Sequence, residues 1–151
     1  MNIFITEDDM CTTQKLNLAR VHKWFEANNC KIIDDANIAD KILVMTCNGF
    51  SLLEDRSYKR IQEYKENYKN KMIAVGCLVD SHPKQVAEIW DGPVVKTESK
   101  KTMSFSDIEN LFPDFNTPLC TPWLSAKNTS TLQELLKLFK VSNDLSDGLG
   151  M

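Results

Sequence analysis

The sequence predicts an α/β fold in which helices cover both faces of a parallel sheet. Short apolar runs alternate with amphipathic helical patterns over about the first 100 residues, which is the signature of repeated strand–helix units. Two of the runs, 41–45 and 72–75, are almost wholly apolar, as expected of strands that are buried on both faces. Crossovers in such sheets are right-handed. We therefore favour a doubly wound, flavodoxin-like sheet with strand order 2-1-3-4-5.

Each predicted strand is a short apolar run that ends at a polar or turn-forming residue. The five strands are expected at 2–6, 31–33, 41–45, 72–75 and 93–95. Apolar residues at helical spacing predict the helices between them. The helices are expected from Thr12 to Asn28, from Ser51 through Tyr68, from Pro83 through Trp90, and in a short stretch from Ser106. Ser51 with Glu54 matches a capping box, as does the Ser-x-x-Glu pattern at Ser106.

The alternation of strand and helix patterns stops after Phe112, so we predict a domain boundary there. Residues 1–112 are expected to form the α/β domain, and residues 113–151 a linker followed by a helical tail. Three prolines punctuate the linker. Thr131 and Glu134 match a further capping box, and Leu132 to Phe139 carry apolar residues at helical spacing. This amphipathic tail helix is expected either to fold back on the sheet or to dock on a partner.

Composition narrows the class of protein. With 151 residues, 42% of them apolar and 26% charged, the chain is an ordinary globular protein. Its net charge of −3 argues against a dedicated nucleic-acid binder. No apolar run is as long as a membrane span, and the N-terminus does not look like a signal peptide. We expect a cytoplasmic protein with no membrane partner, in which the thiols stay reduced.

Three of the five cysteines fall where such a sheet binds ligands. Cys47 and Cys77 end the third and fourth strands, and Cys11 lies in the loop after the first. The carboxyl ends of parallel strands share one rim, so these three thiols should converge there. Cys30 is expected at the opposite rim, and Cys120 shares no such position. Three thiolates suit a soft metal or an iron–sulfur cluster, and nearby helix starts favour the thiolate form. Packing as small apolar side chains is the alternative.

Two stretches, "ADKILVMTCNGF" and "KMIAVGCLVDSHP", resemble the N-terminal domain of radical S-adenosylmethionine (SAM) methylthiotransferases, enzymes that modify transfer RNA or a ribosomal protein. The resemblance covers about Ile3 to Trp90 and puts Cys11, Cys47 and Cys77 on the family's three cysteine positions. It implies that these residues hold an auxiliary [4Fe-4S] cluster for sulfur or methylthio transfer. It also implies a radical SAM domain or subunit as partner, which would bring the substrate RNA or protein.

The sequence departs from that family in three residues and in its extent. Met10 stands where the family usually has glycine, and Gln14 and Met45 stand where it usually has asparagine. The Cys-x3-Cys-x2-Cys motif of the catalytic domain has no match here, and the nucleic-acid-binding domain has no counterpart. The chain is therefore either a separated N-terminal domain or a stand-alone relative. By itself it is expected to be inactive and not to cleave SAM.

Two other functions are compatible with the sequence. The acidic run 7–9 resembles the Mg²⁺-binding acidic pair of response-regulator receiver domains. Those domains need an acceptor aspartate at the end of the third strand, where this chain has Thr46 and Cys47. This alternative is therefore a receiver-like binding module without phosphorylation. The second alternative is a structural zinc site in which His82, five residues after Cys77, is the fourth ligand.

Overall fold

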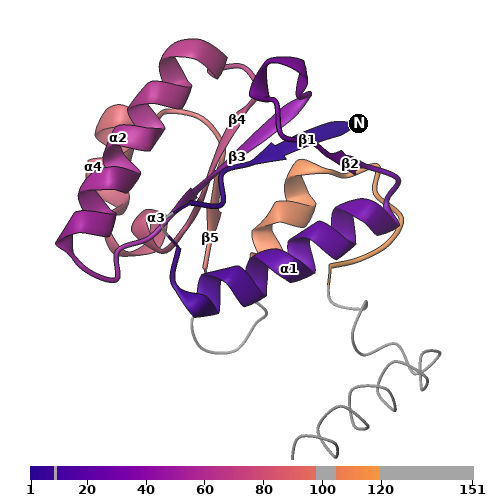
Figure 1. The fold of residues 1–151 in the computed structure, drawn as a ribbon, viewed down its shortest axis with the longest axis horizontal. Helices are drawn as coiled ribbons and strands as arrows, with labels where there is room; N and C mark the ends of the chain where they lie inside the picture. The colour runs from indigo at the N-terminus through magenta and orange to yellow at the C-terminus, as the bar shows by residue number, and fades with distance from the viewer. Residues whose placement is uncertain (9, 98–104, 120–151) are drawn as a thin grey trace, which may run out of the picture. The chain divides into compact units, whose positions relative to one another are not determined.

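The core of the structure is one sheet of five parallel strands. They are β1 (Asn2–Ile5), β2 (Lys31–Ile32), β3 (Lys41–Thr46), β4 (Met72–Gly76) and β5 (Val94–Lys96). In the computed structural model, which describes residues 1–8, 10–97 and 105–119, their order is β2-β1-β3-β4-β5 (Figure 1). This confirms the predicted flavodoxin-like order and places the switch point between β1 and β3.

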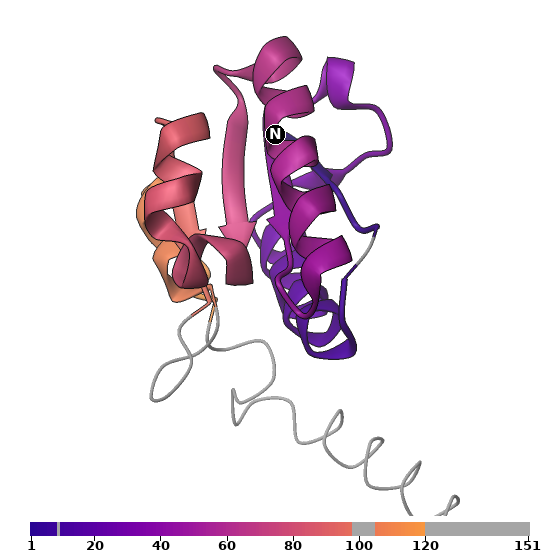
Figure 2. The ribbon, with the colours of Figure 1, turned by 90° about the vertical axis from the view of Figure 1, so that its left-hand side faces the viewer.

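Helices cover both faces of the sheet, as predicted. The helices are α1 (Thr12–Ala27), α2 (Ser51–Tyr68), α3 (Cys77–Ser81) and α4 (Pro83–Ile89), with two short 3-10 helices, η1 (Ala36–Ile38) and η2 (Ser106–Leu111). Helix α1 and η2 lie on one side of the sheet, and α2 and α4 on the other (Figure 1). Figure 2 looks onto the second face, with β4 visible between α2 and α4.

The apolar runs reflect burial on both faces. In β3, Leu43 and Met45 pack in the core beneath α1, whereas Ile42 and Val44 pack in the core beneath α2 and α4. Successive side chains of a strand point to opposite faces, so a strand covered on both sides has apolar residues at every position. Within the described residues, no helix is both long and apolar enough to span a membrane.

Two helices are capped one residue earlier than predicted. Helix α2 is capped by Phe50, whose backbone carbonyl accepts hydrogen bonds from the N–H groups of Leu53 and Glu54. Ser51 is therefore the first helical residue and makes no side-chain cap. The same shift occurs at η2, which is capped by Phe105 in the left-handed conformation (φ 66°). Phe105 is fully buried, so its packing in the core, and not the Ser-x-x-Glu pattern, determines where η2 begins.

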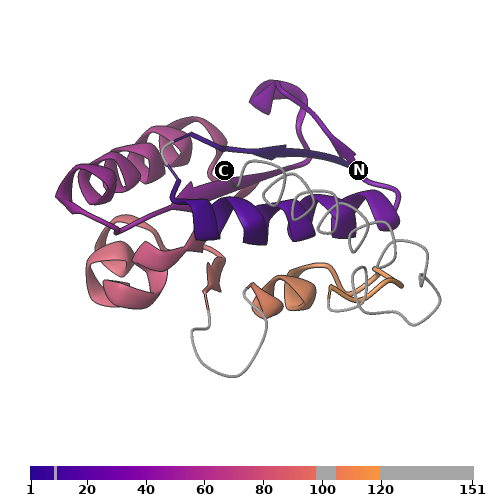
Figure 3. The same cartoon turned by 60° about the horizontal axis from the view of Figure 1, so that its bottom comes forward.

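The segment 105–119 packs alongside α1 (Figure 3). The indole N–H of Trp24 donates to the carbonyl of Thr117 at 2.7 Å. Asn28 donates to the same carbonyl at 3.0 Å and accepts from the Thr117 N–H at 2.9 Å. Phe112 packs edge-on against the Trp24 ring, and Phe115 packs against it at a tilt. The first seven residues of the predicted 113–151 linker thus pack on α1, while the predicted tail helix lies outside the described residues.

Candidate functional site

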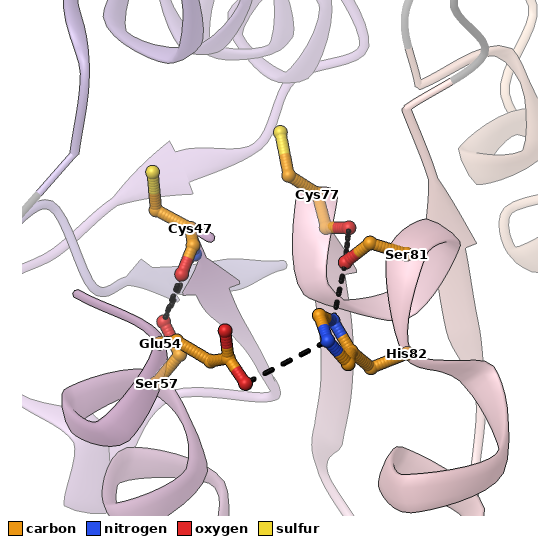
Figure 4. A network of polar contacts seen from close by, with 6 residues as sticks. All are labelled: Cys47, Glu54, Ser57, Cys77, Ser81 and His82. Carbon is orange, nitrogen blue, oxygen red and sulfur yellow. Dashed lines mark hydrogen bonds and ion pairs between the residues drawn. The ribbon is translucent and has the colours of Figure 1, made fainter. Parts of the chain in front are cut away.

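Two cysteines lie side by side at the carboxyl rim of the sheet because their strands end together. Thr46 of β3 pairs with Gly76 of β4, and Cys47 and Cys77 are the next residues of each strand. Figure 4 shows both sulfur atoms pointing the same way from this rim. Cys77 is also the first residue of α3. The two thiols therefore come from neighbouring strands of the sheet, although 30 residues separate them in the sequence.

Cys11 approaches the same rim from the other side of the switch point. It is the N-cap of α1 and lies in the loop that follows β1. Charge on Cys47 or Cys11 raises the pKa of Cys77, so both side chains lie within electrostatic range of the Cys77 sulfur. The exposure of the three residues differs: Cys11 is exposed, Cys77 is half-buried and Cys47 is buried. One thiol thus faces solvent while the other two are held by the fold.

The thiols do not form a ready-made site for a single ion. Among residues 1–8, 10–97 and 105–119, no three His, Cys, Asp or Glu side chains are grouped closely enough to hold one metal ion. A single ion needs every ligand within bonding distance of one point. A group with several metal atoms links thiols that lie farther apart.

Cys30 lies at the opposite rim, as expected. It is buried and follows α1, immediately before β2. Burial raises the pKa of its thiol, the charged N-terminus lowers it, and Asp40 raises it. Both charged groups stand near the starts of strands β1 and β3, which identifies this rim as the amino end of the sheet. Cys120 lies outside the described residues.

Burial changes the acidity of the Cys77 thiol. Desolvation is the largest influence and raises the pKa of this thiol, while a hydrogen bond from Gln14 lowers it. The sequence led us to expect that the helix start would favour the thiolate, whereas burial favours the protonated form of this side chain.

Buried hydroxyl groups fix the strand ends that carry the thiols. Ser57 of α2 accepts a hydrogen bond from the Cys47 N–H at 2.9 Å and donates to the Cys47 carbonyl at 3.1 Å (Figure 4). Thr6 accepts from the Met45 N–H at 2.9 Å, which extends the pairing of β1 with β3. Thr46 donates to the Val75 carbonyl at 2.9 Å. These bonds hold the chain on both sides of the switch point.

The three residues that depart from the family pattern have different environments. Met10 and Met45 are buried and belong to the apolar core beneath α1. Gln14 is also buried, but its side-chain Nε2 lies 2.6 Å from the Sγ of Cys77. Two of the departures therefore contribute to packing, and the third contacts the thiol site directly.

His82 points away from the thiols. Its Nδ1 lies 2.7 Å from the Oγ of Ser81, and its Nε2 lies 3.7 Å from the Oε1 of Glu54. In Figure 4 this ring lies on the opposite side of Cys77 from the sulfur atom. Both ring nitrogens thus have other partners, which leaves the zinc alternative without its fourth ligand in this arrangement.

The described residues of the acidic run, Glu7 and Asp8, have partners other than the end of β3. Glu7 and Asp8 are exposed, and Asp9 lies outside the described residues. Glu7 pairs with His22 at 2.8 Å, and the backbone carbonyl of Asp8 accepts a hydrogen bond from Arg60 at 3.0 Å. The position of an acceptor aspartate is taken by a buried Thr46 and by Cys47.

Sequence reasoning noted Gln14 only as a departure from the family pattern and missed Ser57, although a signal exists for the burial of each. Ser57 lies four residues from both Leu53 and Ile61 on the buried side of α2. Gln14 lies four residues before Leu18 on the buried side of α1. A polar side chain in the apolar stripe of a helix requires a buried partner, and both partners here belong to cysteines of the rim.

Replacing Ser57 with alanine is expected to destabilise the chain by about 1–3 kcal/mol. The substitution leaves the N–H and carbonyl of Cys47, which is 2% exposed, without the partner they share. Urea unfolding of the full chain measures the effect. Ser81→Ala is the matched control, because exposed Ser81 donates to the Cys77 carbonyl at 2.9 Å and its loss should change stability by less than about 0.5 kcal/mol. Equal effects of the two substitutions would contradict the assigned role of Ser57.

The comparison with protein families matches residues 9–95 to Uncharacterized protein family UPF0004. The match begins at the loop before Cys11 and ends in β5, so it includes Cys11, Cys47 and Cys77 and the ends of β3 and β4. Neither the comparison with curated proteins nor that with solved structures gave a match. The match covers more than half of the chain. The chain also has the flavodoxin-like fold that its sequence predicts. The chain therefore belongs to UPF0004, the family of the N-terminal domain of radical SAM methylthiotransferases.

Proposed function

We propose that this chain holds an auxiliary [4Fe-4S] cluster through Cys11, Cys47 and Cys77, and that the cluster serves sulfur or methylthio transfer. The observation that carries the proposal is the gathering of these thiols at the switch-point rim of a UPF0004 domain. Open α/β sheets bind their ligands at this position. Thiolates are the usual ligands of iron–sulfur clusters.

The surroundings of the thiols fit an inorganic group of this kind. Gly49 lies next to Cys47, and a Cβ at Gly49 would be 3.7 Å from the Cys47 Sγ. The absence of a side chain there leaves one flank of the sulfur open. This open flank leaves room for an inorganic group beside the Cys47 sulfur.

The residues of the rim have different roles in holding the cluster. Ser57 fixes the backbone of Cys47 from both sides, so this ligand is held in place before the metal arrives. Cys11, which is exposed, is the ligand that a partner or an incoming sulfur source can approach. When bound, a cluster with three cysteine ligands supplies a coordination position that is open to a sulfur species.

A radical SAM catalytic domain or subunit is the partner we propose. This sequence contains no Cys-x3-Cys-x2-Cys motif, so we assign reductive cleavage of SAM to that partner. The partner also brings the substrate, either RNA or protein. Exposed apolar side chains at the start of α2, Phe50 and Leu52, and Leu16 in α1 support docking near the rim.

Anaerobic reconstitution of the full chain with iron and sulfide tests the proposed function. We expect about four iron atoms per chain and the visible absorption of an iron–sulfur cluster. Mössbauer spectra identify the cluster type. Binding of zinc, without colour and without an iron signal, would instead support the structural zinc site. Failure to take up either metal would overturn both proposals.

A further inference from the structure

Gln14 makes a direct contact with one of the rim sulfur atoms. Its side chain is 1% exposed, and its Nε2 lies 2.6 Å from the Sγ of Cys77. Ser57 and Ser81, by contrast, bind backbone atoms of Cys47 and Cys77. An amide N–H is a hydrogen-bond donor. Gln14 is therefore placed to influence the charge on the sulfur itself.

Among the described residues, no group donates a hydrogen bond to the other end of the same amide, the buried Oε1 of Gln14. A buried polar atom without a partner destabilises the folded state. An apolar side chain at this position of α1, in line with Leu18, would avoid that cost. Packing alone therefore does not explain why an amide lies here.

We propose that Gln14 is a positioning residue of the cluster, which donates a hydrogen bond to the metal-bound thiolate of Cys77 and raises the reduction potential of the cluster. The inference rests on the proposed function, because it requires that Cys77 is a ligand. A thiolate bound to iron is deprotonated and accepts hydrogen bonds. Donors to cluster sulfur atoms stabilise the more negative, reduced state, which raises the potential.

The structure also explains why the donor comes from α1. Cys77 begins α3, beyond the carboxyl end of β4, and Gln14 lies in the first turn of α1, three residues after Cys11. The hydrogen bond thus ties the ligand on β4 to the helix that carries the ligand after β1. Gln14 is expected to hold these two ligands in a fixed relation across the switch point.

Gln14→Met tests the proposal in the full chain after anaerobic reconstitution. Methionine has a similar length but cannot donate a hydrogen bond. We expect iron content close to that of the wild type and a cluster potential shifted to lower values, measured by dithionite titration followed by electron paramagnetic resonance. Gln14→Asn keeps an amide on a shorter side chain, so its potential should lie between those of Gln14→Met and the wild type.

The matched control is Asn28→Met, at the far end of the same helix. Asn28 is an amide that holds Thr117, so its loss should lower the melting temperature and leave the potential unchanged. Gln14→Met should not lower the melting temperature of the cluster-free chain, because it removes the unpaired Oε1. A structural role alone would give the pattern of Asn28→Met, a lower melting temperature with an unchanged potential.

The outcomes separate this inference from the proposed function. If the wild type takes up iron and Gln14→Met has an unchanged potential, the inference is overturned and the proposed function stands. If the wild type takes up no iron, both are overturned. If Gln14→Met folds without taking up a cluster, the cluster potential of Gln14→Asn becomes the test of the inference. A Gln14→Asn potential equal to that of the wild type then overturns the inference, and a lower one supports it.

Discussion

Replacing any one of Cys11, Cys47 and Cys77 with alanine is expected to remove most of the iron from the reconstituted chain. Changing a residue that merely supports a metal ligand already costs about 10–100-fold in affinity, so losing a ligand should cost at least as much. Iron and sulfide analysis of each variant, after parallel anaerobic reconstitution, measures the effect. The visible absorption should fall in proportion.

Cys30→Ala is the control for this series. Cys30 is 8% exposed and lies at the amino rim, so its replacement removes a buried thiol without touching the proposed ligands. We expect full iron content in this variant. Loss of iron from Cys30→Ala, with retention in Cys11→Ala, would show that the ligands are wrongly assigned and that the argument from strand ends fails.

Replacing Gly76 with alanine is expected to be the most damaging change to the fold. Gly76 has φ 117° and ψ −160°, a conformation that is essentially restricted to glycine and costs other residues about 1–3 kcal/mol. A Cβ there would also clash with the carbonyl oxygen of Thr46 on the neighbouring strand, and overpacking adds about 1–3 kcal/mol. The sum, about 2–6 kcal/mol, is a large part of the stability of a typical domain.

Gly49→Ala is the matched control for that substitution. A Cβ at Gly49 makes only ordinary contacts, 3.7 Å from the Cys47 Sγ and 3.8 Å from Leu53. Denaturant unfolding should therefore show a large loss of stability for Gly76→Ala and little for Gly49→Ala. Gly49→Ala should instead lower cluster content, because its methyl group occupies the open flank of Cys47. Equal stabilities of the two variants would refute the account of Gly76.

The sheet could be predicted from the sequence because its central strands are buried on both faces. Runs such as 42–45 have apolar side chains at every position, and they are separated by helical patterns. The rim positions of Cys47 and Cys77 follow from where these runs end. No comparable signal marked α3. Its five residues form a helix because Leu78 and Val79 are buried against the sheet, and that burial depends on residues distant in the sequence.

The side-chain contacts in the structure could not be predicted from the sequence either, because they too join residues that are distant in the sequence. The amide of Gln14 reaches Cys77 across 63 positions, and the indole of Trp24 reaches Thr117 across 93. Prolines near Thr117 suggested a linker, whereas the structure packs that segment on α1. Local patterns predict which residues are buried, but not which distant group satisfies a buried donor.

The position of the thiols on three separate strand–helix units has a consequence for biosynthesis. Strands β1, β3 and β4 pair only with one another and with the two edge strands, and parallel pairing requires a completed crossover. During translation, the first cysteine leaves the ribosome long before the last, and Cys77 joins the other two at the rim only after β4 is made. Such non-local pairings form slowly. The cluster proposed above would therefore find all three of its thiols only on a finished sheet, and a truncated chain that ends before Gly76 lacks Cys77 altogether.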